Sequence, residues 1–202
     1  TIEINSLVLI PINSKKGVYI MYTTIEFRSD ELAMLRGVMA CTAKKSVRYA
    51  LNGFHINSDH IVGTDGSRIA KFNTPHFDGE LPEKGVIIPS IKIPFSIHTV
   101  IITIEDDTVT ADKYSKQGKT TEVYQTIDAN YPLYRNVLAD ADRGKTAVDK
   151  IAFNPMLISE VAKATKTNII QIEFTFGGEL SLIYVNIPEL PEFTFGIMPA
   201  RY

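Results

Sequence analysis

Apolar and polar residues alternate in short runs over much of this 202-residue chain, and turn-forming Asn-Gly and Asp-Gly pairs separate some of the runs. Alternation with a period of two residues, bounded by such pairs, predicts antiparallel strands joined by tight turns. The stretch Val47–Ala70 holds three such runs. It predicts successive strands, with Leu51 facing a core, that close on a turn displaying Ser67 and Arg68.

Two other segments repeat apolar residues at helical spacing. The first follows the strand-like run Ile25-Glu26-Phe27, and we expect Ser29 or Asp30 to be its N-cap. The second is expected to begin with Asn154 as its N-cap and a proline in the first turn. The run at Ile25 aligns with a similar run 126 residues later, at Ile151, which indicates a weak internal repeat of a strand–helix–three-strand unit. The expected apolar faces are Leu32, Leu35, Val38 and Met39 in the first helix, and Leu157, Ile158, Val161 and Ala162 in the second.

The rest of the chain also predicts strands and turns. Residues 1–25 predict a hairpin, residues 73–85 and 139–145 are polar and loop-like, and Pro94 excludes a helix interior between Ser90 and Thr99. Further strands are expected over Val100–Ile104, Thr108–Ala111, Glu122–Ile127, Ile169–Phe176, Leu180–Val185 and Phe193–Met198.

The composition bounds the class of protein. An apolar content of 45% and a charged content of 22% are those of a soluble globular protein. No apolar run approaches the roughly 20 residues of a membrane helix, and no basic region precedes the first apolar run, so we expect no membrane span and no signal peptide. Cys41 is the single cysteine, which excludes an internal disulfide and favours a cytoplasmic protein. The net charge of −2 argues against a protein that coats DNA through many phosphate contacts.

Catalytic signatures are missing from the sequence. There is no G-x-x-x-x-G-K-[ST] loop and no G-x-S-x-G elbow. Turn chemistry explains the acidic pairs Asp106-Asp107 and Asp140/Asp142, and the four histidines are scattered without metal-ligand spacing. We therefore expect no enzyme, no cofactor and no metal site, and a binding function becomes the leading hypothesis.

Three segments carry a resemblance to a known family. The opening stretch reads RYALNG and then GTDGSRIA, which resembles the R-Y-x-L-N-G and A-T-D-G-H-R-L-A segments of the bacterial DNA polymerase III beta subunit, the sliding clamp. Ala129–Leu138 is similar to that family's G-R-F-P-D-Y-R-R-V-L linker, and Gly196–Tyr202 is similar to its terminal V-V-M-P-M-R-L. The three segments occur in the family's order, as in a shortened form that lacks the first domain and part of the last.

The resemblance implies an α+β DNA clamp fold, built from strand–helix–three-strand units with antiparallel sheets and two main helices. Residues 26–138 would form a domain like the clamp's middle domain, and Val86-Ile87-Ile88-Pro89 would start its second half. That half would have lost its helix or kept one turn. Residues 139–202 would form a C-terminal half-domain, which the hairpin of residues 1–25 would complete.

The resemblance also implies a hydrophobic pocket for a short linear peptide motif. An apolar concavity lined by adaptable Met, rigid Pro and an Arg at the rim suits a peptide with Leu or Phe anchors. Departures from the family at Ser67, Asn136, Gly196, Ala200 and Tyr202 would make the pocket roomier near Ala200. The implied pocket residues are Leu51, Thr64, Gly66, Ser67, Arg68, Ile69, Pro132, Asn136, Val137, Met198, Pro199, Ala200 and Arg201. The implied DNA-facing residues are Arg36, Lys44, Lys45, Lys163 and Lys166.

Three functional hypotheses follow. The first is a sliding-clamp-like processivity factor that encircles duplex DNA and tethers a DNA polymerase through the pocket, with the clamp loader as another partner. Because the rings of the clamp family have six domains, a chain with two domains would form a homotrimer. The second is a clamp-derived adaptor or decoy that kept the pocket and lost the ring. The third is a structural β-rich module without a pocket.

Overall fold

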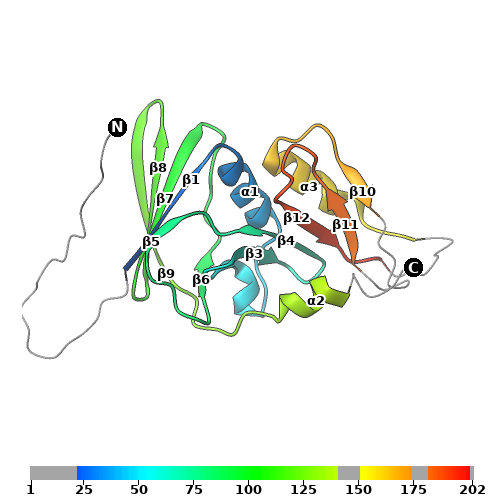
Figure 1. The fold of residues 1–202 in the computed structure, drawn as a ribbon, viewed down its shortest axis with the longest axis horizontal. Helices are drawn as coiled ribbons and strands as arrows, with labels where there is room; N and C mark the ends of the chain where they lie inside the picture. The colour runs from blue at the N-terminus through cyan, green and yellow to red at the C-terminus, as the bar shows by residue number, and fades with distance from the viewer. Residues whose placement is uncertain (1–21, 141–150, 174–181, 201–202) are drawn as a thin grey trace, which may run out of the picture.

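Two antiparallel sheets and three helices make up the computed structural model, which describes residues 22–140, 151–173 and 182–200 (Figure 1). One sheet has the strand order β5 (Phe77–Gly79), β1 (Tyr22–Arg28), β7 (Ile97–Glu105), β8 (Thr108–Ser115) and β9 (Gly118–Gln125). The other has the order β10 (Gln171–Glu173), β11 (Ile183–Asn186), β12 (Thr194–Ile197), β4 (Arg68–Asn73), β3 (His60–Thr64), β2 (Gly53–Ile56) and β6 (Val86–Pro89). The helices are α1 (Ser29–Ala40), α2 (Tyr134–Asp140) and α3 (Pro155–Thr165), and a 3₁₀ turn, η1, covers Tyr49–Asn52. This arrangement confirms the predicted α+β class.

The seven-stranded sheet has a mirrored strand order around its centre. The unit α1-β2-β3-β4 contributes three strands on one side, and α3-β10-β11-β12 contributes three on the other, with β4 and β12 paired antiparallel so that Phe195 lies opposite Ala70. Each unit keeps its helix on the same side, and the two helices lie against each other (Figure 1). The helix and three strands of the repeat inferred from the sequence therefore form two similar units. The first strand of the repeat was predicted wrongly, because residues 151–153 form no strand and β1 belongs to the other sheet.

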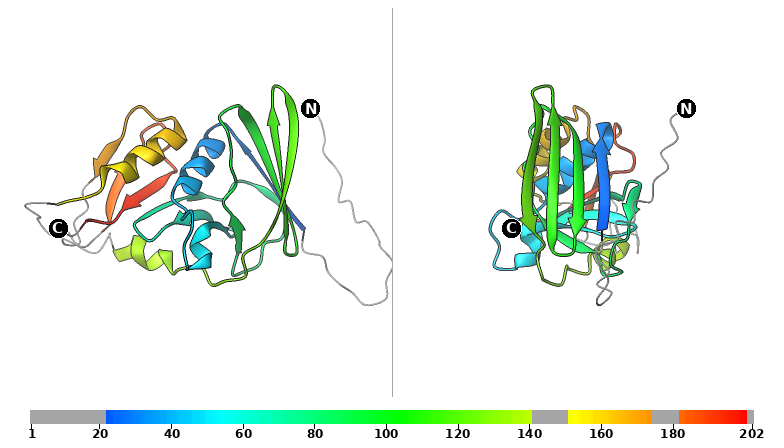
Figure 2. Two further views of the ribbon diagram at one scale, coloured as in Figure 1. Left: turned by 180° about the vertical axis from the view of Figure 1, so that it is seen from behind. Right: turned by 90° about the vertical axis from the view of Figure 1, so that its left-hand side faces the viewer.

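Helix α1 lies between the two sheets and forms the centre of the hydrophobic core. It contacts β1 and β7 of one sheet and β2, β3 and β4 of the other (Figure 2). Its buried residues include Leu32, Leu35 and Val38, as the helical spacing predicted. Gly37 lets α3 approach: a Cβ there would lie 2.9 Å from the methyl carbon of Thr165 and 2.5 Å from the ring of Phe193. Any side chain at this position would push the two helices apart.

The two helix starts differ in how well the sequence predicted them. In α3, the Asn154 carboxamide oxygen accepts a hydrogen bond from the Met156 backbone N–H at 3.0 Å, which confirms the predicted N-cap. In α1, the prediction of Ser29 or Asp30 as the cap was wrong. The helix already begins at Ser29, Arg28 is the N-cap, and the Glu31 carboxylate accepts from the Arg28 backbone N–H at 3.2 Å. The acidic side chain three residues into the helix supplies the cap instead.

Several other elements correct the sequence-based prediction. The run before Asn52 forms η1 and not a strand, and β5 lies within the predicted connector. Helix α2 begins within the predicted linker and ends two residues beyond it, at Asp140. The strands β7 and β8 are longer than predicted, and β9 begins four residues earlier and ends two residues earlier than the predicted Glu122–Ile127. Residues 90–96 contain no helix, as Pro94 indicated.

Some predictions lie wholly or partly outside the described residues. These are most of the hairpin over residues 1–25, the ends of the strands expected over 169–176 and 180–185, and Arg201. The division into domains at residues 25 and 138 stays a prediction, although the β4–β12 pairing makes one sheet continuous across the second boundary. None of the helices within the described ranges is long and apolar enough to cross a membrane.

Candidate functional site

The three segments that carry the sequence resemblance meet in space. They form a second hydrophobic cluster, separate from the main core, to which β3 and β4, the segment around α2, β11 and the residue after β12 contribute. Its buried members are Val62, Ile69, Tyr134 and Leu182, and the partly buried residues packed against them are Tyr131, Leu138, Tyr184 and Met198. We call this group the junction cluster.

Hydrogen bonds tie the same three segments together. The Met198 backbone N–H donates to the carbonyl of Ser67 at 2.7 Å, so the chain beyond β12 continues along the β3–β4 turn. The Tyr131 hydroxyl donates to the carbonyl of Val62 at 3.2 Å, and the Tyr184 hydroxyl donates to the carbonyl of Leu138 at 2.8 Å. Burial raises the pKa of Tyr131, which keeps this hydroxyl protonated as a donor. The junction is therefore joined by side-chain bonds as well as by apolar contacts.

The turn between β3 and β4 is shaped by its own side chains. Thr64 donates its hydroxyl to the carbonyl of Arg68 at 2.7 Å, and the Asp65 carboxylate accepts from the backbone N–H groups of Ser67 and Arg68 at 2.8 and 3.1 Å. Gly66 has a φ of 91°, a backbone conformation that favours glycine. Thr64 is buried by this arrangement, whereas Gly66 and Ser67 are exposed at the tip of the turn.

Arg68 does not lie where a rim donor would. Its side chain is 7% exposed and its guanidinium pairs with Asp65 at 3.0 Å and with Glu160 at 2.7 Å. It also donates to the carbonyl of Leu157 at 3.3 Å. Asp65 belongs to the same turn and the other two partners belong to α3, so Arg68 links the turn to α3. The role at the pocket rim that the resemblance implied is corrected to a structural one.

We call the exposed residues of the segment around α2, which are chain neighbours of the cluster members Tyr134 and Leu138, the apolar surface over the junction cluster. Pro132, Asn136 and Val137 are exposed there, as the resemblance implied. Leu133 is 79% exposed and was missed, although an apolar residue between Pro132 and a helix start was a usable signal. Of the remaining predicted pocket residues, Ile69 is buried, Met198 and Pro199 are half-buried, Ala200 is exposed, and Leu51 is buried but is not a member of the junction cluster.

The interior of the junction cluster is filled by the chain's own side chains. A Cβ built on Gly196 would lie 2.5 Å from a methyl carbon of Leu182, so no larger residue fits at position 196 while Leu182 packs there. Leu182 itself is 3% exposed and Tyr134 is 7% exposed. The space beside Gly196 is thus occupied by Leu182, and the extra room expected near Ala200 stays a prediction.

The cationic residues on the helices are placed in two different ways. Arg36 of α1 is half-buried and donates to the carbonyls of Ile93, Pro94 and Ile97 at 2.8–3.3 Å, which fixes the helix-free segment after β6. The Arg36 guanidinium therefore forms hydrogen bonds within the chain, which argues against a purely DNA-facing role. Burial lowers the pKa of Arg36. Its guanidinium carbon lies 5.2 Å from the ring centroid of Phe95, and the Lys166 ammonium lies 4.4 Å from the same ring.

The four predicted lysines are all exposed. Lys44 and Lys45 follow α1, Lys163 lies in the last turn of α3, and Lys166 caps its C-terminal end in a left-handed conformation with a φ of 58°. Phe95, which is half exposed, brings the cations of the α1 and α3 ends onto one surface, and the sequence gave no indication of this role.

Solved structures of DNA polymerase III beta subunits are similar to this chain over most of its length. The subunit from Thermotoga maritima matches with a TM-score of 0.57 and 17% identity, covering 98% of this chain and 70% of that chain. The subunit from Borrelia burgdorferi, solved in complex with a natural product, matches with a TM-score of 0.60 and 16% identity over 88% and 64%. The Caulobacter crescentus subunit matches with a TM-score of 0.59 and 17% identity over 97% and 69%. The chain spans about two thirds of the length of these subunits.

No protein-family model matches the sequence, and no curated protein matches it. At identities of 16–17%, the structural likeness establishes the fold, which is that of the DNA polymerase III beta subunit. It thereby confirms the resemblance that the three sequence segments predicted.

Proposed function

We propose that this chain is a sliding-clamp-like processivity factor. It binds a linear motif of a DNA polymerase, or of a clamp loader, at the apolar surface over the junction cluster, and it encircles duplex DNA as a homo-oligomer. The observation that carries the proposal is the meeting of three segments far apart in the chain in the junction cluster, with Leu133 79% and Val137 42% exposed on one of these segments. Exposed apolar residues grouped beside a buried aromatic cluster are typical of peptide-binding surfaces.

The arrangement of the helices supports the DNA-facing part of the proposal. Helices α1 and α3 lie side by side. The C-terminal end of α3 carries Lys163 and Lys166, and Lys44 and Lys45 lie in the segment that follows α1. Exposed lysines at helix ends suit weak, sequence-independent phosphate contacts, which a ring needs in order to slide. Because the net charge of the chain is −2, DNA would be retained by enclosure and not by a strong overall field.

Peptide binding is tested with a fluorescently labelled peptide that carries Leu and Phe anchors. Val137→Asp and Leu133→Asp should each weaken binding about tenfold or more, because a desolvated anchor typically contributes that much. Val47→Asp is the matched control, since Val47 is 93% exposed and lies outside the junction cluster. Equal affinities for all these variants would contradict the peptide site and favour a structural β-rich module.

Ring formation is tested separately. Light scattering should give three times the 22.5 kDa mass of the chain for a homotrimer, and the protein should stay on circular DNA but slide off linear DNA. A second candidate, a non-ring adaptor or decoy, is favoured by the helix-free segment after β6. A monomer that binds the peptide but is not retained on circular DNA would support this adaptor.

A further inference from the structure

A cavity of about 260 Å³ lies at the surface where α1, the end of α3 and the helix-free segment after β6 meet. Its volume is just below the range of about 300–1,000 Å³ that is typical of small-ligand sites, which suits a single anchoring side chain. The apolar residues that line it are Met39, Ala40, Ile91, Ile93, Phe95 and Ala164. We call it the Phe95 cavity.

The wall of the cavity that comes from the segment after β6 is fixed in place. The Arg36 guanidinium donates to the carbonyls of Ile93 and Pro94 at 3.3 and 3.2 Å, which ties the segment to α1. Ile91 is 3% exposed at the inner end of this wall, whereas Phe95 is 50% exposed at its outer end. The cavity is therefore formed before any ligand binds, and it leaves part of an aromatic side chain uncovered.

The positive charge beside the cavity is not neutralised by a carboxylate. The Lys166 ammonium lies 4.4 Å from the ring centroid of Phe95, and the Arg36 guanidinium carbon lies 5.2 Å from it. Lys163, three residues before Lys166, is exposed on the last turn of α3. Within the described residues, no ion pair engages any of these three cations. The cavity therefore favours a ligand that carries negative charge next to an apolar group.

The lining of the cavity suits an aliphatic side chain better than a nucleobase. A nucleobase binds by stacking on a free aromatic face and by hydrogen bonds to its polar edges. Here two cations already lie over the ring of Phe95. Apart from Arg36, whose Nε and Nη2 donate to backbone carbonyls, the lining side chains are apolar. The flexible Met39 side chain can adapt to an aliphatic group that enters beside it.

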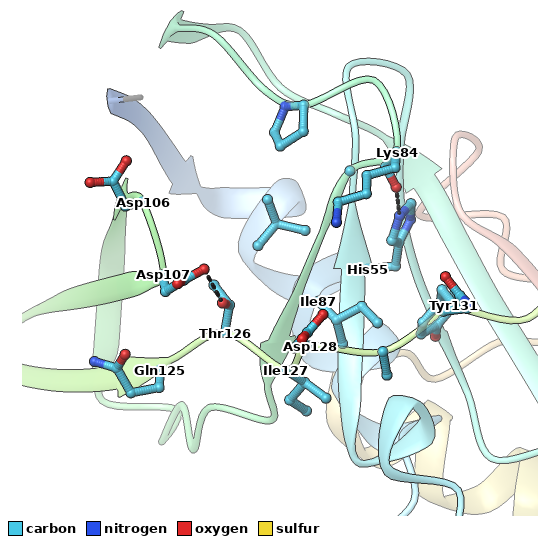
Figure 3. A pocket seen from close by; sticks show the side chains of 15 residues that line it. His55, Lys84, Ile87, Asp106, Asp107, Gln125, Thr126, Ile127, Asp128 and Tyr131 are labelled. Atoms are coloured by element: carbon cyan, nitrogen blue, oxygen red, sulfur yellow. Dashed lines mark hydrogen bonds between the residues drawn. The ribbon is translucent and has the colours of Figure 1, made fainter. Parts of the chain in front are cut away.

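A second cavity has the opposite charge. It measures about 650 Å³ and lies where the segment after β9 passes β6 (Figure 3). Three aspartates line it, Asp106, Asp107 and Asp128, against one lysine, Lys84. Because like charges repel, an acidic ligand is disfavoured in this larger cavity and favoured at the Phe95 cavity.

We infer that the Phe95 cavity binds an acidic segment of a partner protein, which inserts one aliphatic side chain and pairs its flanking carboxylates with Lys163 and Lys166. The inserted side chain covers the exposed part of Phe95, and this apolar contact supplies most of the affinity. The carboxylates orient the segment and speed its association, because ion pairs at the surface are largely screened.

This inference needs neither a ring nor the junction cluster. The proposed function turns the same two lysines, Lys163 and Lys166, toward DNA. A bound acidic segment and DNA would therefore exclude each other, and this consequence alone rests on the proposed function.

The test uses the full chain and a fluorescently labelled heptapeptide with a central leucine between aspartate and glutamate residues. Two probes of the same length separate the contributions of the anchor and the charge. One has serine in place of the leucine, and the other has asparagine and glutamine in place of the acidic residues. Each should bind at least about fivefold more weakly than the parent peptide.

Variants of the chain locate the binding site. Phe95→Ala should weaken binding of the parent peptide about five- to tenfold. Tyr22→Ala is its matched control, because Tyr22 is 49% exposed and does not line the cavity. Phe95→Leu should keep the affinity within about twofold, since it preserves an apolar side chain. Lys166→Gln should weaken binding about two- to fivefold, whereas Lys84→Gln, which replaces another exposed lysine, should not.

The inference is overturned if either altered peptide binds as tightly as the parent peptide, or if Phe95→Ala and Tyr22→Ala have the same effect. It is also overturned if Val137→Asp weakens binding as much as Phe95→Ala does, because the peptide would then bind over the junction cluster. Tighter binding of single-stranded oligothymidylate, with the same dependence on Phe95, would assign the cavity to nucleic acid instead.

The two proposals can fail separately. Duplex DNA should displace the labelled peptide from the chain. If the peptide binds as described but duplex DNA does not displace it, the DNA-facing part of the proposed function fails and the Phe95 cavity keeps its role.

Discussion

The ion pairs of Arg68 link the β3–β4 turn to α3, and their contribution to stability can be measured. The guanidinium lies 2.7 Å from Glu160 and 3.0 Å from Asp65, and it donates to the carbonyl of Leu157. The Arg68 side chain is 7% exposed, whereas that of Glu160 is 45% exposed. Arg68→Met keeps most of the apolar stem and removes all of these interactions.

The magnitude follows from the exposure of the partners. Two unit charges about 4 Å apart attract each other by about 4 kcal/mol at an effective dielectric constant of about 20. Because Glu160 is nearly half exposed, screening and desolvation reduce the Arg68–Glu160 attraction to about 1–2 kcal/mol. The hydrogen bonds to Asp65 and to the Leu157 carbonyl add about 1 kcal/mol. Arg68→Met should therefore lower the free energy of unfolding by about 2–3 kcal/mol.

Urea unfolding of the parent chain, Arg68→Met, Glu160→Gln and the double variant gives the coupling energy between the two side chains directly. We expect a coupling of about 1–2 kcal/mol. Arg48→Met is the matched control, because Arg48 is exposed, and it should change stability by less than about 0.5 kcal/mol. A coupling below about 0.3 kcal/mol, or equal effects of Arg68→Met and Arg48→Met, would refute the structural role of Arg68. The guanidinium would then be available to a bound peptide, as the resemblance first implied.

Three further predictions concern buried groups. Burial lowers the pKa of His55 below its usual 6.5, so the unfolded chain binds a proton before the folded chain does as the pH falls. The free energy of unfolding should therefore fall by up to about 1.4 kcal/mol per pH unit below pH 6.5. Urea unfolding at stepped pH should show a smaller fall for His55→Gln. Gly196→Val should destabilise the chain by about 1–3 kcal/mol through overpacking, and Leu182→Ala in the same chain should recover part of the loss in thermal unfolding; additive losses would contradict the contact. Lys113 is 3% exposed and donates to the carbonyl of Lys92 at 2.8 Å. Lys113→Met should therefore lower the free energy of unfolding by about 1–3 kcal/mol and speed hydrogen exchange in the segment after β6. Unchanged exchange would argue against a role of this hydrogen bond in holding the segment.

Local patterns in the sequence accounted for most of the secondary structure. Alternation placed β7, β8 and β9, and helical spacing with an Asn-Pro start placed α3, because these signals act over a few neighbouring residues. Pro94 excluded a helix from the segment after β6 for the same local reason. The start of α1 was misjudged by one residue, since a glutamate three positions along supplied the cap where a serine was expected.

The junction cluster shows what the sequence motifs could predict and what they could not. The three matching segments identified which parts of the chain meet, and Val137 and Pro132 lie on the exposed side as expected. The direction of each side chain was not encoded in the motifs. Arg68 turns inward because Glu160 lies within reach on α3, a residue 92 positions away.

By itself, the sequence determined most of the strands, the two main helices and the three segments that converge, because each depends on short-range periodicity or on a recognisable motif. Only the tertiary structure decided that Arg36 and Arg68 serve the fold, that Leu182 fills the space beside Gly196, and that the Nδ1 atom of His55 is buried without a hydrogen-bond partner. The physical reason is the same in each case. Burial, charge pairing and free volume arise between residues far apart in the chain, and they exist only once the two sheets have closed on α1.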